Sequence, residues 1–455
     1  MAIESINPAT GELLAAYDEL TPAQVEAALK KARQAFSSWR QSTFAERRAL
    51  LLKMSRLLTD EKKDLARLMS TEMGKPVMQA EAEIEKCATV CGHYAEHAER
   101  ILAMETVSFE GGNSYVRFDA LGAILAVMPW NFPFWQVFRF AAPALMAGNV
   151  CLLKHSSNVP ECARRIGELF RQAGFPEHVF TELRIGSAQV ESVIAHPLVQ
   201  AVTLTGSEPA GRQVAELAGR SLKKVVLELG GSDPFIVLAD ASLPQCVAVA
   251  VNARMINNGQ SCIAAKRFIV EEEIASAFQY EFVAAVEKLR VGDPLDPGND
   301  LGPLARADLV DDLERQVTES VRRGARILTG GKRLSGPPGF YFQPTVLDRV
   351  RPGMPAYDQE LFGPVAALIS AKDADDAVRI ANDTPFGLGA SVWTQDLVRA
   401  EKMAARIEAG MVFINGLVRS DPRLPFGGIK NSGFGRELSH YGIKEFVNIK
   451  TVVVS

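Results

Sequence analysis

The chain has 455 residues, enough for two or three domains, and 47% of its residues are hydrophobic while 23% are charged. This composition is typical of folded globular proteins and excludes a largely disordered chain. The net charge of −4 without a basic tail argues against nucleic acid as the main partner, and no signal peptide is visible. The longest apolar stretch, 121–130, is about half as long as a membrane helix, so no membrane partner is expected.

The cysteines are spread without the spacing of a disulfide framework; they are Cys87, Cys91, Cys151, Cys162, Cys246 and Cys262. One helix could not gather Cys87, Cys91 and the histidines that follow them around a metal ion, so we expect no metal site. A reducing cytoplasm is the expected compartment.

The first hundred residues are predicted to be mostly helical. Thr21-Pro22-Ala23-Gln24 combines a capping hydroxyl, a proline at the first helical position and a glutamine three residues after the cap. Further amphipathic helices are predicted over 47–68 and 80–102.

Residues 106–119 predict two strands around a Gly-Gly turn, and the apolar tail 445–454 predicts a further strand. An exposed apolar strand invites pairing with another strand. We therefore expect the hairpin and the tail to pair with each other or across subunits. Together, residues 106–119 and 436–455 form a predicted small β oligomerisation element.

From residue 121 onward, apolar strands alternate with helices. Strands are predicted over 122–128, 150–154, 201–205 and 224–229, and a second series follows Gly230-Gly231 with strands over 234–237 and 266–270. This repetition predicts an α/β protein with parallel sheets that are covered on both faces. We expect a nucleotide-binding domain over 1–105 and 120–230 and a catalytic domain over 231–435.

Two residues predict the chemistry. Cys262 ends the segment Asn258-Gly259-Gln260-Ser261-Cys262, and Glu228 lies in an otherwise apolar strand. A thiolate attacks carbonyl carbon and is a good leaving group, and a carboxylate can activate the water that releases an acyl group from sulfur. Burial should raise the pKa of Glu228 toward neutrality, which suits a base. The pair predicts aldehyde oxidation through a thiohemiacetal and a thioester; the alternatives are a core thiol and a structural salt bridge.

Seven motifs together resemble the aldehyde dehydrogenases. They occur in family order and span nearly the whole chain: Pro129-Trp130-Asn131-Phe132-Pro133, Leu153-Lys154, Thr205-Gly206-Ser207, Glu228-Leu229-Gly230-Gly231, Gly259-Gln260-Ser261-Cys262, Glu360-Leu361-Phe362-Gly363-Pro364 and Pro425-Phe426-Gly427-Gly428-Ile429-Lys430. The chain is most similar to the short, NADP-using bacterial succinate-semialdehyde dehydrogenases. The resemblance implies a Rossmann-type nucleotide-binding domain, an α/β catalytic domain and a small β oligomerisation element.

The resemblance also implies the catalytic roles. Cys262 is the nucleophile, and the Asn131 amide with the backbone N–H of Cys262 holds the oxygen that gains charge. The alternative for Asn131 is a turn-capping residue. Glu228 is the general base for thioester hydrolysis, whereas relatives that pass the acyl group to coenzyme A lack this glutamate.

The cofactor site lacks a Gly-x-Gly-x-x-Gly motif. Instead, Thr205-Gly206-Ser207-Glu208 runs from a strand into a helix, whose N-terminus offers free N–H groups to a pyrophosphate. The alternative is an ordinary serine-capped helix. The resemblance adds cofactor contacts at the adenosine ribose, at the nicotinamide ribose and ring, and nearby: Lys154, Ser157, Glu360, Phe362, Trp130, Gly186 and Leu229.

Ser157 bears on the choice of cofactor. NAD-preferring relatives often carry glutamate at this position, and that carboxylate would repel a 2′-phosphate. Serine removes the repulsion while Lys154 supplies a cation nearby, so we expect NADP to be preferred, with NAD possible.

Arg139 is the predicted substrate residue, in an apolar helical segment eight positions after Asn131. It shares a helix face with Trp135 and could hold the far carboxylate of a semialdehyde by paired hydrogen bonds. The alternative is an internal ion pair. Ser420 is its preferred partner, Arg419 or Arg423 is a third member, and Phe426 borders the tunnel.

The predicted reaction is oxidation of succinate semialdehyde to succinate by a cytoplasmic homodimer or homotetramer. Three alternatives stay open. They are another aldehyde, such as glutarate semialdehyde or a simple aliphatic one, a cysteine hydrolase without redox chemistry, and a catalytically silent protein of the same fold.

Overall fold

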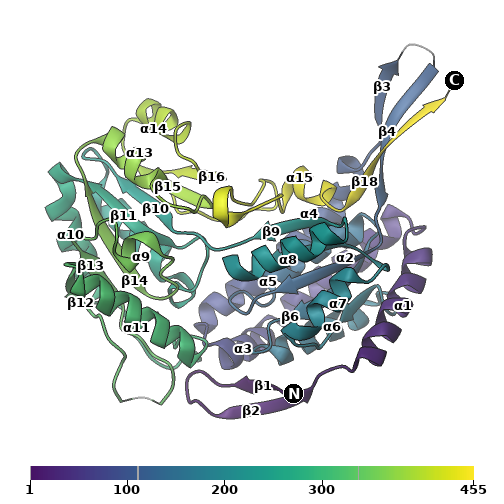
Figure 1. The fold of residues 1–455 in the computed structure, drawn as a ribbon, viewed down its shortest axis with the longest axis horizontal. Helices are drawn as coiled ribbons and strands as arrows, with labels where there is room; N and C mark the ends of the chain where they lie inside the picture. Colours follow the sequence, from purple (N-terminus) through teal and green to yellow (C-terminus); the bar gives the residue numbers. More distant parts are fainter. Residues whose placement is uncertain (1, 110–111, 337, 455) are drawn as a thin grey trace.

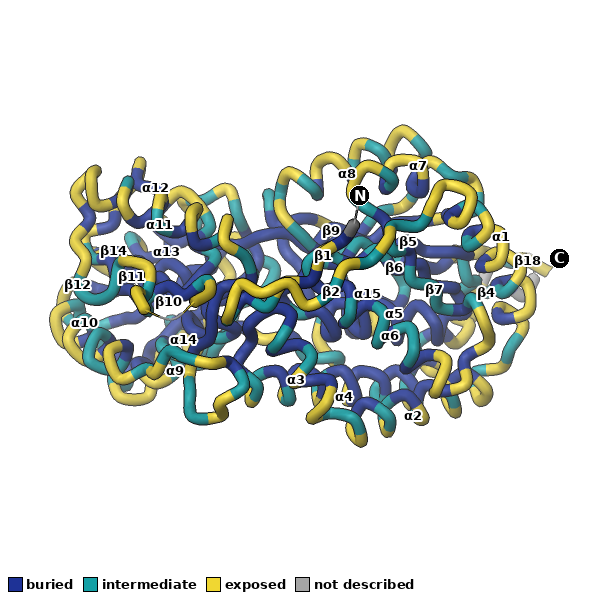
Figure 2. The backbone as a smooth tube through the Cα atoms, turned by 90° about the horizontal axis from the view of Figure 1, so that it is seen from below, coloured by how far each residue is buried: buried dark blue, intermediate teal, exposed yellow. Residues whose placement is uncertain are grey.

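Two sheets organise the chain, one in each half of the molecule (Figure 1). The structure is a computed structural model that describes residues 2–109, 112–336 and 338–454. We call the half that holds the six-stranded sheet the first lobe and the half that holds the seven-stranded sheet the second lobe. Figure 2 shows most strands of the two large sheets in the buried colour, with exposed residues on the outer helices, on the loops and along β2.

The first lobe contains the predicted parallel sheet, in the order β17-β9-β8-β5-β6-β7. Its strands are β5 (Ala123–Met128), β6 (Val150–His155), β7 (Phe180–Glu182), β8 (Val199–Thr205), β9 (Lys224–Glu228) and β17 (Gly433–Phe434). All of these pairs are parallel except β17 with β9. The four strands predicted for this lobe are confirmed, and their nearly continuous apolar runs are buried on both faces.

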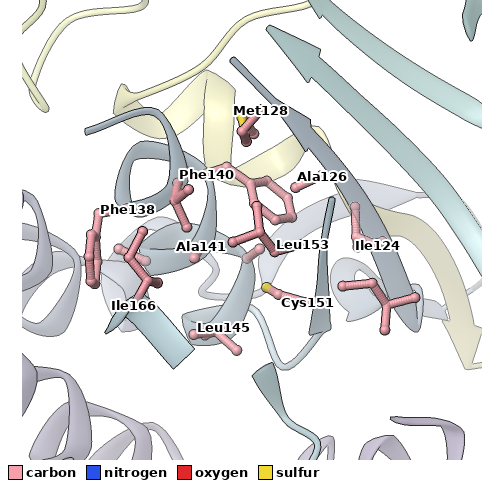
Figure 3. Packing of buried hydrophobic residues seen from close by; sticks show 14 of the residues in the cluster. Ile124, Ala126, Met128, Phe138, Phe140, Ala141, Leu145, Cys151, Leu153 and Ile166 are labelled. Atoms are coloured by element: carbon pink, nitrogen blue, oxygen red, sulfur yellow. The ribbon is translucent and has the colours of Figure 1, made fainter. Parts of the chain in front are cut away.

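The helices that pack on this sheet are α1 (Pro22–Trp39), α5 (Trp135–Met146), α6 (Pro160–Ala173), α7 (Val190–Ala195) and α8 (Glu208–Arg220). Three more helices pack on α5 and α6 or on one another: α2 (Phe44–Asp60), α3 (Lys62–Met73) and α4 (Val77–Ile101). The capping box at Thr21 is confirmed. Every residue of α5 is buried, and Figure 3 shows its apolar side chains against those of β5 and β6.

The single helix predicted over 47–68 is wrong, because α2 ends at Asp60 and α3 begins at Lys62. The apolar spacing continues from Leu58 to Leu65 across the break, so periodicity does not reveal it. Both helices pack against α4. A hairpin of β1 (Ala2–Ile6) and β2 (Leu13–Asp18) was also missed in the region predicted to be mostly helical.

The second lobe has the strand order β12-β13-β14-β11-β10-β15-β16, with only β12 antiparallel to its neighbour. The strands are β10 (Asp233–Val237), β11 (Ala265–Glu271), β12 (Arg326–Thr329), β13 (Thr345–Asp348), β14 (Val365–Ala371), β15 (Gly389–Trp393) and β16 (Met411–Ile414). Its helices are α9 (Leu243–Met255), α10 (Glu272–Val286), α11 (Ala307–Arg322), α12 (Pro355–Asp358), α13 (Ala374–Asn382) and α14 (Leu397–Ala404).

A three-stranded antiparallel sheet projects from the first lobe (Figure 1). It consists of β3 (Glu105–Phe109), β4 (Gly112–Ala120) and β18 (Val447–Val454), and we call it the arm. The predicted pairing of hairpin and tail is confirmed, and it occurs within one chain. The predicted Gly-Gly turn falls partly on residues 110–111, which lie outside the described residues.

The C-terminal part of the chain returns to the first lobe earlier than predicted. Residues up to 435 were assigned to the catalytic domain, but β17 pairs with β9 and brings Gly433 opposite Glu228. The short helix α15 (Ser439–Lys444), expected in the oligomerisation element, packs against both α5 and β18. Across the described residues, no helix combines the length and apolar character needed to cross a membrane.

Candidate active site

A cavity of about 400 Å³ lies between the two lobes. The first lobe contributes the ends of β5, β8 and β9 with the loops that follow them, and the second lobe contributes the segments around Cys262 and Glu360. Its walls include most of the predicted reacting groups: Trp130, Asn131, Thr205, Gly206, Ser207, Leu229, Cys262, Glu360 and Phe362. The carboxyl ends of parallel strands are where ligands bind in open α/β sheets.

A strained turn presents Cys262 to this cavity. Asn257, Asn258 and Gly259 follow one another with φ of 54°, 58° and 74°. Asparagine tolerates this left-handed region, and a Cβ at Gly259 would overlap the carbonyl of Gly363. The Asn257 side chain donates to the carbonyls of Asn131 (2.7 Å) and Gln260 (3.0 Å). These bonds tie the turn to the loop that carries Asn131.

Cys262 differs from the other cysteines of the chain. The other five are buried, whereas Cys262 is partly exposed and lines the cavity. Its surroundings raise the pKa of the thiol to about 11, mainly by desolvation, while the charges of Lys266 and Arg139 act in the opposite direction. The Lys266 ammonium donates to the carbonyl of Cys262 (2.7 Å) and forms an ion pair with Glu360 (3.1 Å).

The predicted oxyanion donors lie in the same wall. The Asn131 amide is buried, donates to the carbonyl of Gln260 (3.1 Å) and contacts the Gln136 side chain (3.0 Å). Among the described residues, no acceptor takes the backbone N–H of Cys262. The site therefore holds one fixed amide and one free N–H beside the sulfur.

Glu228 is a buried carboxyl without a hydrogen-bond partner among the described residues. Its side chain lies against Gly427, and its backbone carbonyl accepts from Gly206 N (3.0 Å) at the cavity edge. Burial raises the pKa of Glu228 well above its ordinary value, and the neighbouring charge of Glu437 raises it further. An unpartnered buried carboxyl is costly, and such groups are concentrated at functional sites.

A second cavity of about 630 Å³ adjoins the first, and Arg306 lines both. Ser157 and Gly186, two of the predicted cofactor residues, form part of its wall. Glu19 also lines it and accepts from Gly186 N (3.0 Å). The charge of Glu19 partly offsets the desolvation that lowers the pKa of Lys154, so Lys154 lies within electrostatic reach of this cavity.

The residues present fit a dinucleotide that spans the two cavities. Ser207 starts α8 but makes no capping bond to it, so its hydroxyl is free to face a ligand, against the alternative of a serine cap. Trp130 and Phe362 meet edge to face with ring centroids 5.7 Å apart, and the Arg306 guanidinium lies over Trp130. Glu208 is the exception, because it pairs with Arg212 (2.7 Å) and lines neither cavity.

The predicted substrate residues divide into two groups. Arg139 is only 3% exposed, forms an ion pair with Glu437, stacks on Phe426 and donates to Thr205 (3.3 Å). This is the internal ion pair that was the alternative for Arg139, and its role toward substrate stays a prediction.

Trp135 and Ser420 both contact Lys86, a residue that was not predicted from the sequence. Lys86 Nζ lies 4.3 Å from the centroid of the Trp135 ring and donates to Ser420 Oγ (2.6 Å). Of the possible third members, Arg423 pairs with Asp421 (2.7 Å) and Arg419 is exposed.

Three functional candidates were missed: Lys86, Lys266 and Arg306. Lys266 had a local signal, because it follows Cys262 by only four residues, after the apolar run Ile263-Ala264-Ala265. Lys86 and Arg306 had none, since each reaches the site from an element distant in sequence.

The fold and the cavity together define an α/β protein with a partly exposed cysteine in a cleft between two sheets. A family model described as the aldehyde dehydrogenase family matches residues 1–452. The chain belongs to the aldehyde dehydrogenase family, as the resemblance implied.

Relatives and solved structures agree with this assignment. A Synechocystis protein named probable succinate-semialdehyde dehydrogenase [NADP(+)] is 52% identical over 455 residues, which cover 100% of both chains. The Mycobacterium tuberculosis protein named succinate-semialdehyde dehydrogenase [NADP(+)] 1 is 49% identical over 458 residues, again 100% of both. The structure of succinic semialdehyde dehydrogenase from Streptococcus pyogenes in complex with NADP⁺ gives a TM-score of 0.97 at 37% identity, with full coverage of both chains.

Proposed function

We propose that this protein oxidises succinate semialdehyde to succinate with NADP, through a covalent intermediate on Cys262. The observation that carries the proposal is the position of Cys262. Among the described residues it is the only cysteine that is not buried, and it lines a cavity beside the Asn131 amide.

In this scheme the Cys262 sulfur bonds to the aldehyde carbon, and the carbonyl oxygen takes up the developing negative charge. The Asn131 amide and the Cys262 N–H stabilise that charge by donating to it. A bound NADP would supply the acceptor for the hydride that leaves the carbon. The thioester that remains on Cys262 is then attacked by water, Glu228 takes the proton, and the carbon–sulfur bond breaks to release the acid.

The raised pKa values of Cys262 and Glu228 determine which protonation states the nucleophile and the base have at neutral pH. Without ligand the thiol is mostly protonated at neutral pH, so the nucleophile has to lose a proton before it attacks. Lys266 favours the thiolate because its charge lies beside the sulfur. The raised pKa of Glu228 brings that carboxyl closer to the operating pH, where a general base is most effective.

The choice of cofactor is supported by Ser157, whose short neutral side chain lines the second cavity. A 2′-phosphate in this cavity would meet no carboxylate from position 157. Lys154 lies within electrostatic reach of the same cavity, and its positive charge would favour the phosphate. Arg306 faces both cavities from the second lobe, and we propose that it covers the bound cofactor.

We also propose a cytoplasmic homodimer or homotetramer that assembles through the arm. The arm exposes apolar side chains, among them Val107 (48%), Ile449 (61%) and Val453 (47%). Exposed apolar strands of this kind mark association surfaces.

A kinetic panel tests the function. Succinate semialdehyde, glutarate semialdehyde and butanal would be compared with NADP and NAD by following absorbance of the reduced nicotinamide. We expect the highest kcat/KM for succinate semialdehyde with NADP, abolition by Cys262→Ala, and retention in the matched Cys246→Ala variant. Turnover that survives Cys262→Ala would refute the scheme, and ester cleavage with no nicotinamide-dependent oxidation would favour a cysteine hydrolase.

A further inference from the structure

The turn that presents Cys262 is held from the opposite lobe. Asn257 and Asn258 belong to the second lobe, and both have positive φ. This left-handed conformation is unfavourable for a residue that carries a side chain, and it persists only where the surrounding contacts fix it. The contacts of these two asparagines therefore decide whether the turn keeps the geometry that places the sulfur in the cavity.

The corner of the first lobe where α3 ends and α4 begins supplies two of these contacts. The backbone carbonyl of Gly74 accepts from Asn258 Nδ2 (2.8 Å), and Gln79 Oε1 accepts from the backbone N–H of Asn257 (2.6 Å). Both asparagines are fully buried, so an unpaired polar group on either would be costly. Gln79 itself is only partly buried, and its other described hydrogen bond is a long one to the carbonyl of Asp300 (3.4 Å).

The same corner also holds the loop that carries Asn131. Glu83 lies one helical turn further along α4 and accepts from the N–H groups of Phe134 (3.0 Å) and Trp135 (2.9 Å), where α5 begins. The Glu83 carboxylate is buried and pairs with Lys75, which fixes its position. One segment of the first lobe thus contacts both the loop of the predicted oxyanion donor and the turn of the nucleophile.

We propose that Gln79 is a positioning residue for the oxidation. Its bond to the N–H of Asn257 keeps the nucleophile turn aligned with the Asn131 amide, so that the two oxyanion donors, one from each lobe, are aimed at the same point. Donors of this kind act only where the negative charge develops, and a small displacement removes much of their effect. This inference rests on the proposed function.

Asn257 is the residue through which a displacement would spread. Its side chain donates to the carbonyls of Asn131 (2.7 Å) and Gln260 (3.0 Å), while its backbone N–H is held by Gln79. The Asn131 amide in turn donates to the carbonyl of Gln260 (3.1 Å). A shift of Asn257 therefore moves the amide and the segment that leads to Cys262 together.

A purely structural link between the lobes would have a different effect. Such a link changes the fraction of the protein that is folded, whereas a positioning residue changes the rate of reaction at each folded site. The two quantities are separable, because only folded protein binds NADP.

Gln79→Met tests the proposal, because methionine has a similar length but offers no strong acceptor to the Asn257 N–H. Loss of this hydrogen bond should lower the single-turnover rate of nicotinamide reduction, measured with enzyme in excess over succinate semialdehyde, about three- to tenfold. The affinity for NADP and the number of NADP-binding sites per chain, titrated by fluorescence, should stay unchanged. Gln79→Glu keeps the acceptor oxygen and should retain most of the rate. Gln172→Met, at an exposed position on α6, is the matched control and should behave as wild type.

The outcomes separate this inference from the proposed function. If the unmodified enzyme reduces no nicotinamide with succinate semialdehyde, the proposed function fails. If it does, and Gln79→Met is as fast as wild type or Gln79→Glu is as slow as Gln79→Met, the inference about Gln79 is wrong. Fewer NADP-binding sites with an unchanged rate at each site would establish a purely structural link and would also overturn the inference.

Hydrogen exchange in the unmodified protein tests the contact without any variant. The Asn257 amide should be strongly protected, because it is buried and bonded to Gln79. Exchange would be followed at single residues by fragmentation mass spectrometry. In Gln79→Met the Asn257 amide should exchange faster, while the amide of Phe268 in the central strand β11 should be unaffected. An Asn257 amide that exchanges like an unprotected one in the unmodified protein would overturn the proposal.

Discussion

The guanidinium of Arg139 forms a buried ion pair with Glu437, and both charges act on the carboxyl of Glu228. The pair joins α5 to the segment that follows β17, so it connects two parts of the first lobe that are distant in sequence. A buried pair is weak evidence for net stabilisation, but removing one partner leaves the other charge uncompensated.

We therefore expect Arg139→Ala to lower the free energy of unfolding by about 3–5 kcal/mol, measured by chemical denaturation. The double variant Arg139→Met/Glu437→Gln should recover part of that loss, because it removes the uncompensated charge. If Arg139 serves only as an internal ion pair, the activity of Arg139→Ala should fall alike for succinate semialdehyde and butanal. A rise in KM confined to acidic aldehydes, with stability unchanged, would instead establish Arg139 as the substrate clamp.

Glu228→Gln should separate the two halves of the reaction. Without the base, hydrolysis of the thioester slows and steady-state kcat falls by roughly 10²–10⁴. The first turnover should still release about one reduced nicotinamide per active site, seen as a burst in stopped-flow absorbance. If the burst disappears along with turnover, Glu228 acts before hydrolysis.

The raised pKa of Glu228 should also make the rate of thioester hydrolysis depend on pH. Because the pKa of Glu228 is raised, its carboxylate form is gained only as the pH rises above the ordinary range of a glutamate. The rate of hydrolysis in the unmodified enzyme should therefore increase with pH through that raised value. Glu228→Gln should lack this limb in single-turnover measurements across the same pH range, and a limb that persists would assign it to another group.

Ser157→Glu should shift cofactor preference toward NAD. A carboxylate at this wall of the second cavity would repel a 2′-phosphate and accept hydrogen bonds from ribose hydroxyls. We expect the NADP-to-NAD ratio of kcat/KM to fall by about tenfold or more, as a close like-charge contact costs at least about 1.4 kcal/mol. Ser192→Glu on the exposed face of α7 is the control, and an equal effect there would point to net charge alone.

Alkylation of Cys262 reports its pKa directly. The thiolate is the reactive form, so with the pKa raised to about 11 the rate with iodoacetamide should still be increasing between pH 9 and 10, where an ordinary cysteine is close to its plateau. Lys266→Met removes a charge that favours the thiolate and should lower the rate at a given pH. A plateau near pH 7 in the ligand-free protein would contradict the structure.

Local patterns were sufficient to predict much of the fold and the site. The Thr21 capping box and the parallel strands leading to Asn131 and Glu228 are each encoded within a few residues. Family membership followed from the order of the motifs.

The features of the fold and the site that could not be predicted depend on which helices, strands and loops pack together in the folded chain. The break at Glu61 is hidden by apolar spacing that continues across it, and the pairing of β17 with β9 joins residues about 200 positions apart. Lys86 reaches Ser420 from a distant helix, and Glu437 had no local sign that it would neutralise Arg139.

The return of the chain at β17 gives the two lobes two covalent connections, one after Glu228 and one between β16 and β17. Two tethers limit how far the lobes can separate more than they limit rotation about the line that joins the tethers. We therefore expect the cleft to widen by rocking when a large dinucleotide is exchanged.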